Sequence, residues 1–348
     1  MESYRIVTEI ATGHEPEGIA VDVERRRAYV ACARSDAVTI VDLVDFTVVG
    51  EVQVGREPMD IAFDETTGRL FTADLLGETV SVVDTATLGL VATVPVGMYP
   101  SGLALDAGGR RLYCGCALSA TVVVIDVDSL ETVATVPAQP GAGAVAVDGE
   151  RSRVYSADFL AGSVTVIDSE QNCAVEEIDV GAAPCAVAVH PTRGELYVSN
   201  SFADSVTRID LATSAVTTTI KVDRTPVGAA LSRAGDRLYV SNRGGGTVSV
   251  VGIDDATEWA RIPVGDGPGG CTVDPATGHL LVANAGGGSV TVVEDLLAHR
   301  PAVPSAQQTH DLVGRRLPPF VLSDLSGMER TSLEWAERKF ILNFFASW

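Results

Sequence analysis

The chain has 348 residues, about twice the length of a typical single domain, with 34 glycines, 5% aromatic residues and a formal net charge of -21. This acidity disfavours phosphate backbones, so nucleic acids and anionic membranes are poor partners and a cationic or neutral partner is expected. No run of 18 apolar residues occurs, so the sequence predicts no membrane-spanning helix.

The N-terminal residues MESYRIVTEI lack the basic segment and apolar run of a signal peptide. The six cysteines do not form a dense disulfide framework, which favours reduced thiols and a cytoplasmic protein, although an exported form stays open. We expect a monomer without a cofactor. The cysteines are Cys32, Cys114, Cys116, Cys173, Cys185 and Cys271.

Three independent registers repeat every 42 residues without an insertion. The first consists of large apolar or aromatic residues, namely Tyr29, Phe71, Tyr113, Tyr155, Tyr197, Tyr239 and Leu281. The second is mostly acidic, namely Asp42, Asp84, Asp126, Asp168, Asp210, Gly252 and Glu294. The third is mostly proline, namely Pro16, Pro58, Pro100, Ala142, Pro184, Pro226 and Pro268.

Each repeat contains four short β-branched runs bounded by turn residues, which predicts four strands. In the second repeat they lie near residues 61–63, 69–73, 79–83 and 90–96. A unit of about 40 to 45 residues with four strands is the size of a propeller blade. The sequence therefore predicts an all-β fold, a seven-bladed β-propeller over residues 1–298.

The repeats resemble the YVTN family of β-propellers over about residues 5–295. The resemblance rests on the YVSN segments at 197–200 and 239–242, on the G-x-x-P segments that end at Pro58 and Pro100, and on VID at 166–168. It implies the fold strongly but no particular activity, because such propellers carry unrelated functions.

The N-terminal segment is expected to close the ring. Residues 5–13 (RIVTEIATG) align with residues 47–55 (TVVGEVQVG), which form the fourth strand of the first repeat. The seventh repeat has only three strands of its own, between Cys271 and Glu294. The first segment should therefore complete the seventh blade and remove an exposed sheet edge.

Because the strands alternate in direction, the loops fall on two faces. The repeated aspartates end the third strand on one face, where we expect them to accept hydrogen bonds from turn amides. His190 replaces an aspartate of the first strand on that face and is read as a turn residue. The opposite face, which we call the mouth, carries the loops that enter the first strand and those that leave the second.

At the mouth the repeats differ from one another. The second strand ends in Cys32, Asp74, Cys116, Asp158, Asn200, Asn242 and Asn284, and the residue after the proline register is Glu17, Met59, Ser101, Gly143, Cys185, Val227 and Gly269. The loops entering the first strand add His14, Arg56 and Arg224, whereas repeats six and seven have glycine triplets at 244–246 and 286–288. We therefore expect a lopsided mouth.

Three interpretations of this mouth stay open. It could bind a protein or a small molecule, since convergent polar groups in a concavity are the default site. It could bind a metal through Cys32, Cys116 and Asp74, as thiolate and carboxylate ligands allow. It could also reflect drift in a tolerant repeat, because buried cysteine behaves as a small apolar residue. Sequence motifs of serine hydrolases, zinc proteases, phosphate-binding loops and EF-hands are absent.

Composition changes after Leu297, and residues 299–311 are predicted to be a linker. Residues 312–348 then resemble the opening of a redoxin, a thioredoxin-like domain. The resemblance rests on Leu317 to Phe320, on Gly327 and Leu333, and on the run FILNFFASW at 340–348. In that family a C-x-x-C redox pair follows the tryptophan directly, so the redox pair is expected after Trp348 and the given chain is expected to be inactive as a redox enzyme.

Two overall functions follow from these expectations. In the first, the propeller is a binding scaffold fused to a redoxin-like thiol–disulfide oxidoreductase or peroxidase. Four explanations for the interruption of this domain stay open: a UGA codon for selenocysteine, a frameshift, a gene-model error or a cut chain. In the second, the propeller is a non-catalytic interaction protein.

Overall fold

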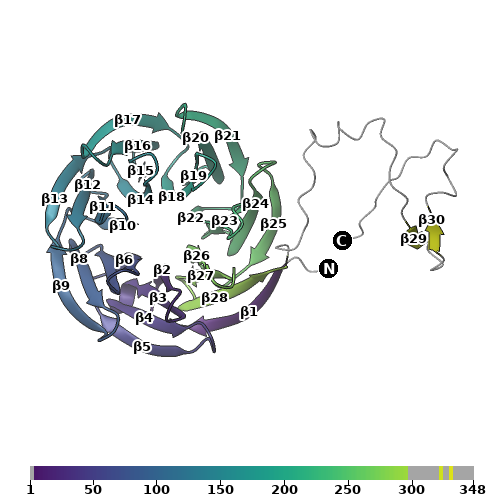
Figure 1. The fold of residues 1–348 in the computed structure, drawn as a ribbon, viewed down its shortest axis with the longest axis horizontal. Helices are drawn as coiled ribbons and strands as arrows, with labels where there is room; N and C mark the ends of the chain where they lie inside the picture. The colour runs from purple at the N-terminus through teal and green to yellow at the C-terminus, as the bar shows by residue number, and fades with distance from the viewer. Residues whose placement is uncertain (1–3, 297–320, 324–328, 332–348) are drawn as a thin grey trace. The chain divides into compact units, whose positions relative to one another are not determined.

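The structure is a computed structural model that describes residues 4–296, 321–323 and 329–331. Residues 4–296 form seven four-stranded antiparallel sheets around a central axis, which confirms the predicted seven-bladed propeller. Figure 1 shows the first strand of each blade innermost, next to the axis, and the fourth strand at the rim.

The strands of the seven blades repeat in length and order. The inner strands are β2 (Pro16–Asp22), β6 (Pro58–Asp64), β10 (Pro100–Asp106), β14 (Ala142–Asp148), β18 (Pro184–His190), β22 (Pro226–Leu231) and β26 (Pro268–Val273). The second strands are β3 (Arg27–Cys32), β7 (Arg69–Asp74), β11 (Arg111–Cys116), β15 (Arg153–Asp158), β19 (Glu195–Asn200), β23 (Arg237–Asn242) and β27 (Leu280–Asn284).

The third strands are β4 (Ala37–Asp42), β8 (Thr79–Asp84), β12 (Thr121–Asp126), β16 (Ser163–Asp168), β20 (Ser205–Asp210), β24 (Thr247–Gly252) and β28 (Ser289–Asp295). The outer strands are β5 (Val48–Gln53), β9 (Gly89–Pro95), β13 (Thr132–Pro137), β17 (Cys173–Asp179), β21 (Ala215–Lys221), β25 (Glu258–Pro263) and β1 (Tyr4–Ala11). A short 3-10 helix, η1 (Ala33–Ser35), follows β3.

The predicted closure is confirmed, because β1 pairs with β28 in the antiparallel sheet of blade seven. Tyr4 lies opposite Asp295 and Ala11 opposite Ser289, so the N-terminal strand serves as the outer strand of the last blade. Figure 1 shows β1 beside β28 at the rim, where the two ends of the ring meet.

The hydrophobic core lies between neighbouring sheets. Each of seven apolar clusters joins residues of two adjacent blades; one example places Tyr29 and Ile40 of blade one against Ile61 and Leu70 of blade two. The tyrosine register supplies the largest buried side chains of these interfaces, and Tyr29, Tyr113, Tyr197 and Tyr239 are at most 1% exposed. The repeated aromatic residue therefore packs one blade against the next.

The acidic register acts as predicted on the turn face. Asp84 accepts hydrogen bonds from the backbone N–H groups of Ala86 and Thr87, and Asp210 accepts the equivalent pair from Ala212 and Thr213. His190 occupies a turn in the same manner, since its Nδ1 accepts from the N–H groups of Thr192 and Arg193. These side chains end their strands and stabilise the turns that follow.

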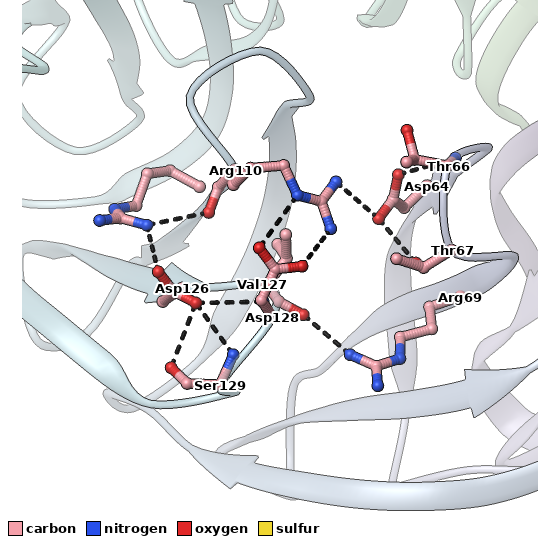
Figure 2. A network of polar contacts seen from close by, with 10 residues as sticks. Asp64, Thr66, Thr67, Arg69, Arg110, Asp126, Val127, Asp128 and Ser129 are labelled. Carbon is pink, nitrogen blue, oxygen red and sulfur yellow. Dashed lines mark hydrogen bonds and ion pairs between the residues drawn. The ribbon is translucent and has the colours of Figure 1, made fainter.

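Arginine side chains on the turn face tie blade two to blade three (Figure 2). The Arg110 guanidinium reaches back to Asp64, 2.9 Å away, and also pairs with Asp128 in its own blade. Arg69 donates to the Val127 carbonyl oxygen at 2.9 Å across the same boundary. Apolar packing therefore stabilises the interface between these two blades, and the polar contacts fix how the blades are oriented relative to each other.

The same arrangement seals the ring between blades seven and one. Arg26 forms a two-pronged pair with the buried carboxylate of Asp274, with N–O distances of 2.9 and 2.8 Å, although the two residues are 248 positions apart. Burial alone would raise the pKa of Asp274, but hydrogen bonds from Arg26 and Thr277 outweigh it and lower the pKa to about 2.

Beyond the propeller the structure describes one two-stranded antiparallel sheet, β29 (Val321–Ser323) and β30 (Glu329–Thr331). The predicted linker and the remainder of the redoxin-like segment lie outside the described residues, so the redoxin resemblance stays a prediction. Among the described residues no helix has the length and apolar character needed to cross a membrane.

We expect Arg26→Ala to lower the free energy of unfolding by about 2–3 kcal/mol at pH 7, because it leaves the buried Asp274 carboxylate without its cation. The folded-state pKa of Asp274 lies below its unfolded value, so this pair stabilises the fold above about pH 4 and is lost as the pH falls towards 2. Urea unfolding at pH 7 and at pH 3 measures both effects.

The control is Arg5→Ala, which removes a more exposed ion pair with Glu294 at the same closure. That change should cost less than about 1 kcal/mol. Equal losses in the two variants would show that Arg26 has no special role in sealing the ring.

Candidate functional site

A β-bulge near the start of every inner strand shapes the axis of the propeller. The pairing of β6 with β7 shifts between Pro58 and Asp60, so Met59 is an extra residue, and β18 shifts at Cys185 in the same way. A bulge bends its strand and redirects a side chain. The bulged positions are those of the post-proline register, which explains why that register reaches the axis.

The axis holds a pocket of about 650 Å³, a size typical of ligand sites. All seven inner strands contribute to its wall, together with residues of the loops on the mouth. Six of the seven bulge-register residues line it, namely Glu17, Met59, Ser101, Gly143, Cys185 and Val227. Of the site residues predicted from sequence, the pocket therefore contains Glu17 and Cys185.

Glu17 is held by an ion pair that sequence reasoning missed. Arg243, in the mouth loop of blade six, donates Nη2 to Glu17 Oε2, and the pair spans blade seven above Gly269. A Cβ at Gly269 would lie 2.6 Å from Glu17 Oε2, so only glycine leaves room for this contact. Burial raises the pKa of Glu17, and Arg243 offsets part of that rise.

Cys185 is a packed thiol rather than a reactive one. Its Sγ donates to the Pro226 carbonyl oxygen at 3.0 Å, and burial raises its pKa to about 12 despite the Arg243 charge nearby. A thiol that stays protonated at neutral pH is a poor nucleophile and a poor metal ligand. Cys185 therefore contributes shape to the pocket wall.

The residues that end the second strands do not reach the pocket. Cys32, Asp74, Cys116 and Asp158 are fully buried inside their own blades. Asp74 accepts hydrogen bonds from Thr72, Thr79 and Ser81 at 2.6 to 2.9 Å. In blade five the Asn200 side-chain amide donates to Thr207 Oγ1 at the equivalent position, so the carboxylate and the amide have the same structural role.

This buried contact also explains the glycine of the G-x-x-P segment. The backbone N–H of Gly55 donates to Ser81 Oγ at 3.0 Å, which brings the loop against Asp74. A Cβ at Gly55 would lie 2.3 Å from Asp74 Oδ2, so the close approach requires glycine. The strand-end register therefore fastens the incoming loop to the blade.

The metal interpretation finds no support in this geometry. Cys32, Asp74 and Cys116 belong to three different blades, and each bonds within its own. Among the residues that the structure describes, no three His, Cys, Asp or Glu side chains are grouped so that they could hold a metal ion. Burial raises the pKa of the Cys32 thiol, which further disfavours thiolate.

The remaining predicted residues lie on loops at the surface. His14, Arg56 and Arg224 are exposed, and none of them lines the pocket. Their backbone groups are used structurally: the N–H of His14 donates to Ser35 Oγ, and that of Arg224 donates to Asp223.

An exposed apolar surface, also missed from sequence, continues outward from one side of the pocket. We call it the apolar crescent, and it consists of Met98, Tyr99, Leu118, Leu160 and Phe202 on mouth loops of blades three to five. Leu160 is 67% exposed and Phe202 is 74% exposed. Phe202 also packs edge-on against Phe159 of the pocket wall, with ring centroids 5.5 Å apart.

The comparison with protein-family models matches residues 2–278 to the YNCE-like beta-propeller. The chain belongs to this family. Hydrazine synthase of Kuenenia stuttgartiensis has a similar structure, with a TM-score of 0.74 and 22% identity over 81% of this chain and 96% of that one. At that identity the likeness shows the fold alone. No curated protein matches the chain.

The propeller offers a direct test of the strand-end register. Burial raises the pKa of Asp158 to about 6, partly offset by hydrogen bonds from Thr165 and Ser156. Because this pKa lies above its unfolded value, ionisation at pH 7 destabilises the fold, and the cost vanishes below about pH 4. Asp158→Asn should therefore raise the free energy of unfolding by about 1–2 kcal/mol at pH 7, with the gain shrinking towards pH 4.

Chemical denaturation across pH 4 to 8 measures this gain. Asp84→Asn is the control of opposite sign, because hydrogen bonds from Thr87 lower the pKa of Asp84 and the substitution should not stabilise the fold. A loss of stability in Asp158→Asn at pH 7 would instead assign a special role to that carboxylate.

Proposed function

We propose that this propeller is a binding protein whose mouth recognises a partner protein. One observation carries the proposal: the axial pocket and the apolar crescent are continuous, since Tyr99, Leu118 and Leu160 belong to both. Contiguous exposed apolar surface next to a concavity is typical of interaction sites. The pocket would take one side chain of the partner, and the crescent would contact residues around it.

The charge of the chain agrees with such a partner. With a net charge of -21, the chain attracts cationic surfaces and repels polyanions. Among the predicted mouth residues, Glu17 and Cys185 enter this proposal as parts of the pocket wall. The six cysteines are free, which supports our further proposal of a reducing, cytoplasmic compartment.

We expect the double variant Leu160→Asp, Phe202→Asp to lose its partner, because two carboxylates would replace the most exposed apolar side chains of the crescent. Full-length wild type and variant would be immobilised, and the retained proteins quantified by mass spectrometry. A specific partner should fall at least tenfold in the variant, which corresponds to about 1.4 kcal/mol.

Val44→Asp is the matched control. Val44 is 72% exposed on the opposite, turn face, so the substitution adds a carboxylate and removes exposed apolar surface without touching the mouth. A protein that binds wild type but neither variant would be a non-specific binder. The proposal would be contradicted if every protein retained by wild type were also retained by the Leu160→Asp, Phe202→Asp variant.

A second candidate function rests on the sequence resemblance of residues 312–348 to a redoxin. In this proposal the propeller docks the partner, and a C-x-x-C pair or a selenocysteine of the complete domain performs thiol–disulfide exchange. Two of the propeller thiols are poorly suited to this chemistry: burial raises the pKa of Cys271 to about 12, and the hydrogen bond with Cys116 together with burial raises that of Cys114.

The nucleotide sequence after the Trp348 codon tests this candidate. An in-frame continuation that begins with UGA or a cysteine codon, followed by two residues and a further cysteine codon, is the expected result. A continuation without redox residues would remove the redoxin proposal and leave the binding proposal unchanged.

A further inference from the structure

One carboxylate in the pocket breaks the pattern of its register. The residue after each bulge is small in six blades and acidic in blade two, the series being Gly18, Asp60, Gly102, Ala144, Ala186, Gly228 and Gly270. The register is small because the strands crowd the axis: a Cβ at Gly102 would lie 2.5 Å from the Gly143 carbonyl oxygen. Asp60 therefore carries a charged side chain at a position where the other blades have only glycine or alanine.

The contacts of Asp60 satisfy its oxygens only in part. Oδ1 accepts from the N–H of Ile61 and Oδ2 accepts from the N–H of Leu103 in blade three, each at 2.8 Å. A carboxylate can accept about four hydrogen bonds, so each oxygen keeps a free lone pair. Asp60 lines the pocket and part of its surface is accessible there.

The charges that line the pocket do not balance without a ligand. Glu17 and Arg243 neutralise each other, and Asp60 forms no ion pair within the part of the chain that the structure describes. Burial raises the pKa of Asp60 to about 6, and the two N–H groups offset part of this shift. At neutral pH the pocket therefore holds one partly buried negative charge that no cation among the described residues compensates.

Blades two and three contribute apolar side chains to the same pocket wall. Met59 and Leu75 come from the same blade, Tyr99 lies in the loop to the next blade, and Leu118 follows β11. An alkyl chain would bury its methylene groups against these side chains. The Tyr99 ring also offers a face to a cation.

We propose that the axial pocket is a binding site for a primary alkylammonium group, with Asp60 as its anionic partner. The group pairs with the free lone pairs of the carboxylate, and its alkyl stem lies along Met59, Leu75 and Leu118. A lysine side chain of a partner protein or a free aliphatic amine would supply this group. This inference takes only one element from the proposed function, namely that the axial pocket is where the protein binds its partner.

Hexylammonium is the probe for this site, measured by isothermal titration calorimetry on the full chain at pH 7.5. Wild type should bind hexylammonium at least tenfold more tightly than hexanol or hexanoate at equal ionic strength. Asp60→Asn should weaken hexylammonium binding at least tenfold, because it removes the charge at nearly constant shape. The control Asp74→Asn changes a buried carboxylate of the same blade outside the pocket and should leave binding unchanged.

A pH series on wild type tests the site without any variant. Protonation of Asp60 below pH 6 should weaken binding, by about tenfold at pH 5. The strands packed against β6 are β2, β3, β7 and β10. Their ionisable residues are Glu17, Asp22, Arg27, Tyr29, Cys32, Arg69, Asp74 and Asp106. Cys114 on β11 also interacts electrostatically with Asp60. Glu17→Gln should keep the pH dependence, which separates Asp60 from the other pocket carboxylate, on the neighbouring strand β2.

A capped leucine–lysine–leucine peptide separates the two sources of the ammonium group. Tighter binding of this peptide than of hexylammonium assigns the site to a lysine of a partner, and the reverse order assigns it to a free amine. Equal affinity for hexanol, or equal binding by wild type and Asp60→Asn, would overturn the inference. Failure of the proposed function is a separate result, because the crescent variants can lose their partner while hexylammonium still binds.

Discussion

Packing between neighbouring sheets is the constraint on which the rest of this molecule depends. The second and third strands of each blade are buried on both faces, so a single blade would expose apolar surface on both sides. Each sheet therefore needs a neighbour on either side, and only a closed ring provides one for every blade. The pairing of β1 with β28 and the Arg26–Asp274 contact follow from this need, since both act where the chain ends would otherwise leave a sheet uncovered.

Ring closure has a consequence at the axis, where seven inner strands converge. The strands fit because their registers are rich in glycine and alanine, and because a bulge near each strand start lets the chain turn away from its neighbours. Six of the seven residues at the bulges line the pocket. The pocket is thus a product of the same geometry that closes the ring, while its chemistry depends on which residues stand at the bulges and just after them.

Much of the fold could be predicted from sequence, because a period of 42 residues in three registers determines strand number, blade count and the place of the N-terminal strand. The site was predicted less well. The sequence led us to expect all the candidate residues around the mouth. In the structure Glu17 and Cys185 line the axial pocket, whereas Cys32, Asp74, Cys116 and Asp158 are buried inside their blades. Spacing alone does not show which way a side chain points at the end of a strand. Asp60 could have been found, since it is the only acidic residue in its register of glycine and alanine.

Departures from the repeat do not all carry the same meaning. On the turn face, Asp64 takes its cation from Arg110 of the next blade, Asp22 takes Arg25 from its own turn, and His190 does without one. These are different solutions to one structural requirement, and the protein satisfies each internally. Asp158 is likewise surrounded by hydroxyl donors from its own blade. Asp60 differs, because it lines the pocket and forms no ion pair with any of the described residues. Asp60 is therefore the departure from the repeat whose charge the fold itself does not balance, and a bound ligand would account for it.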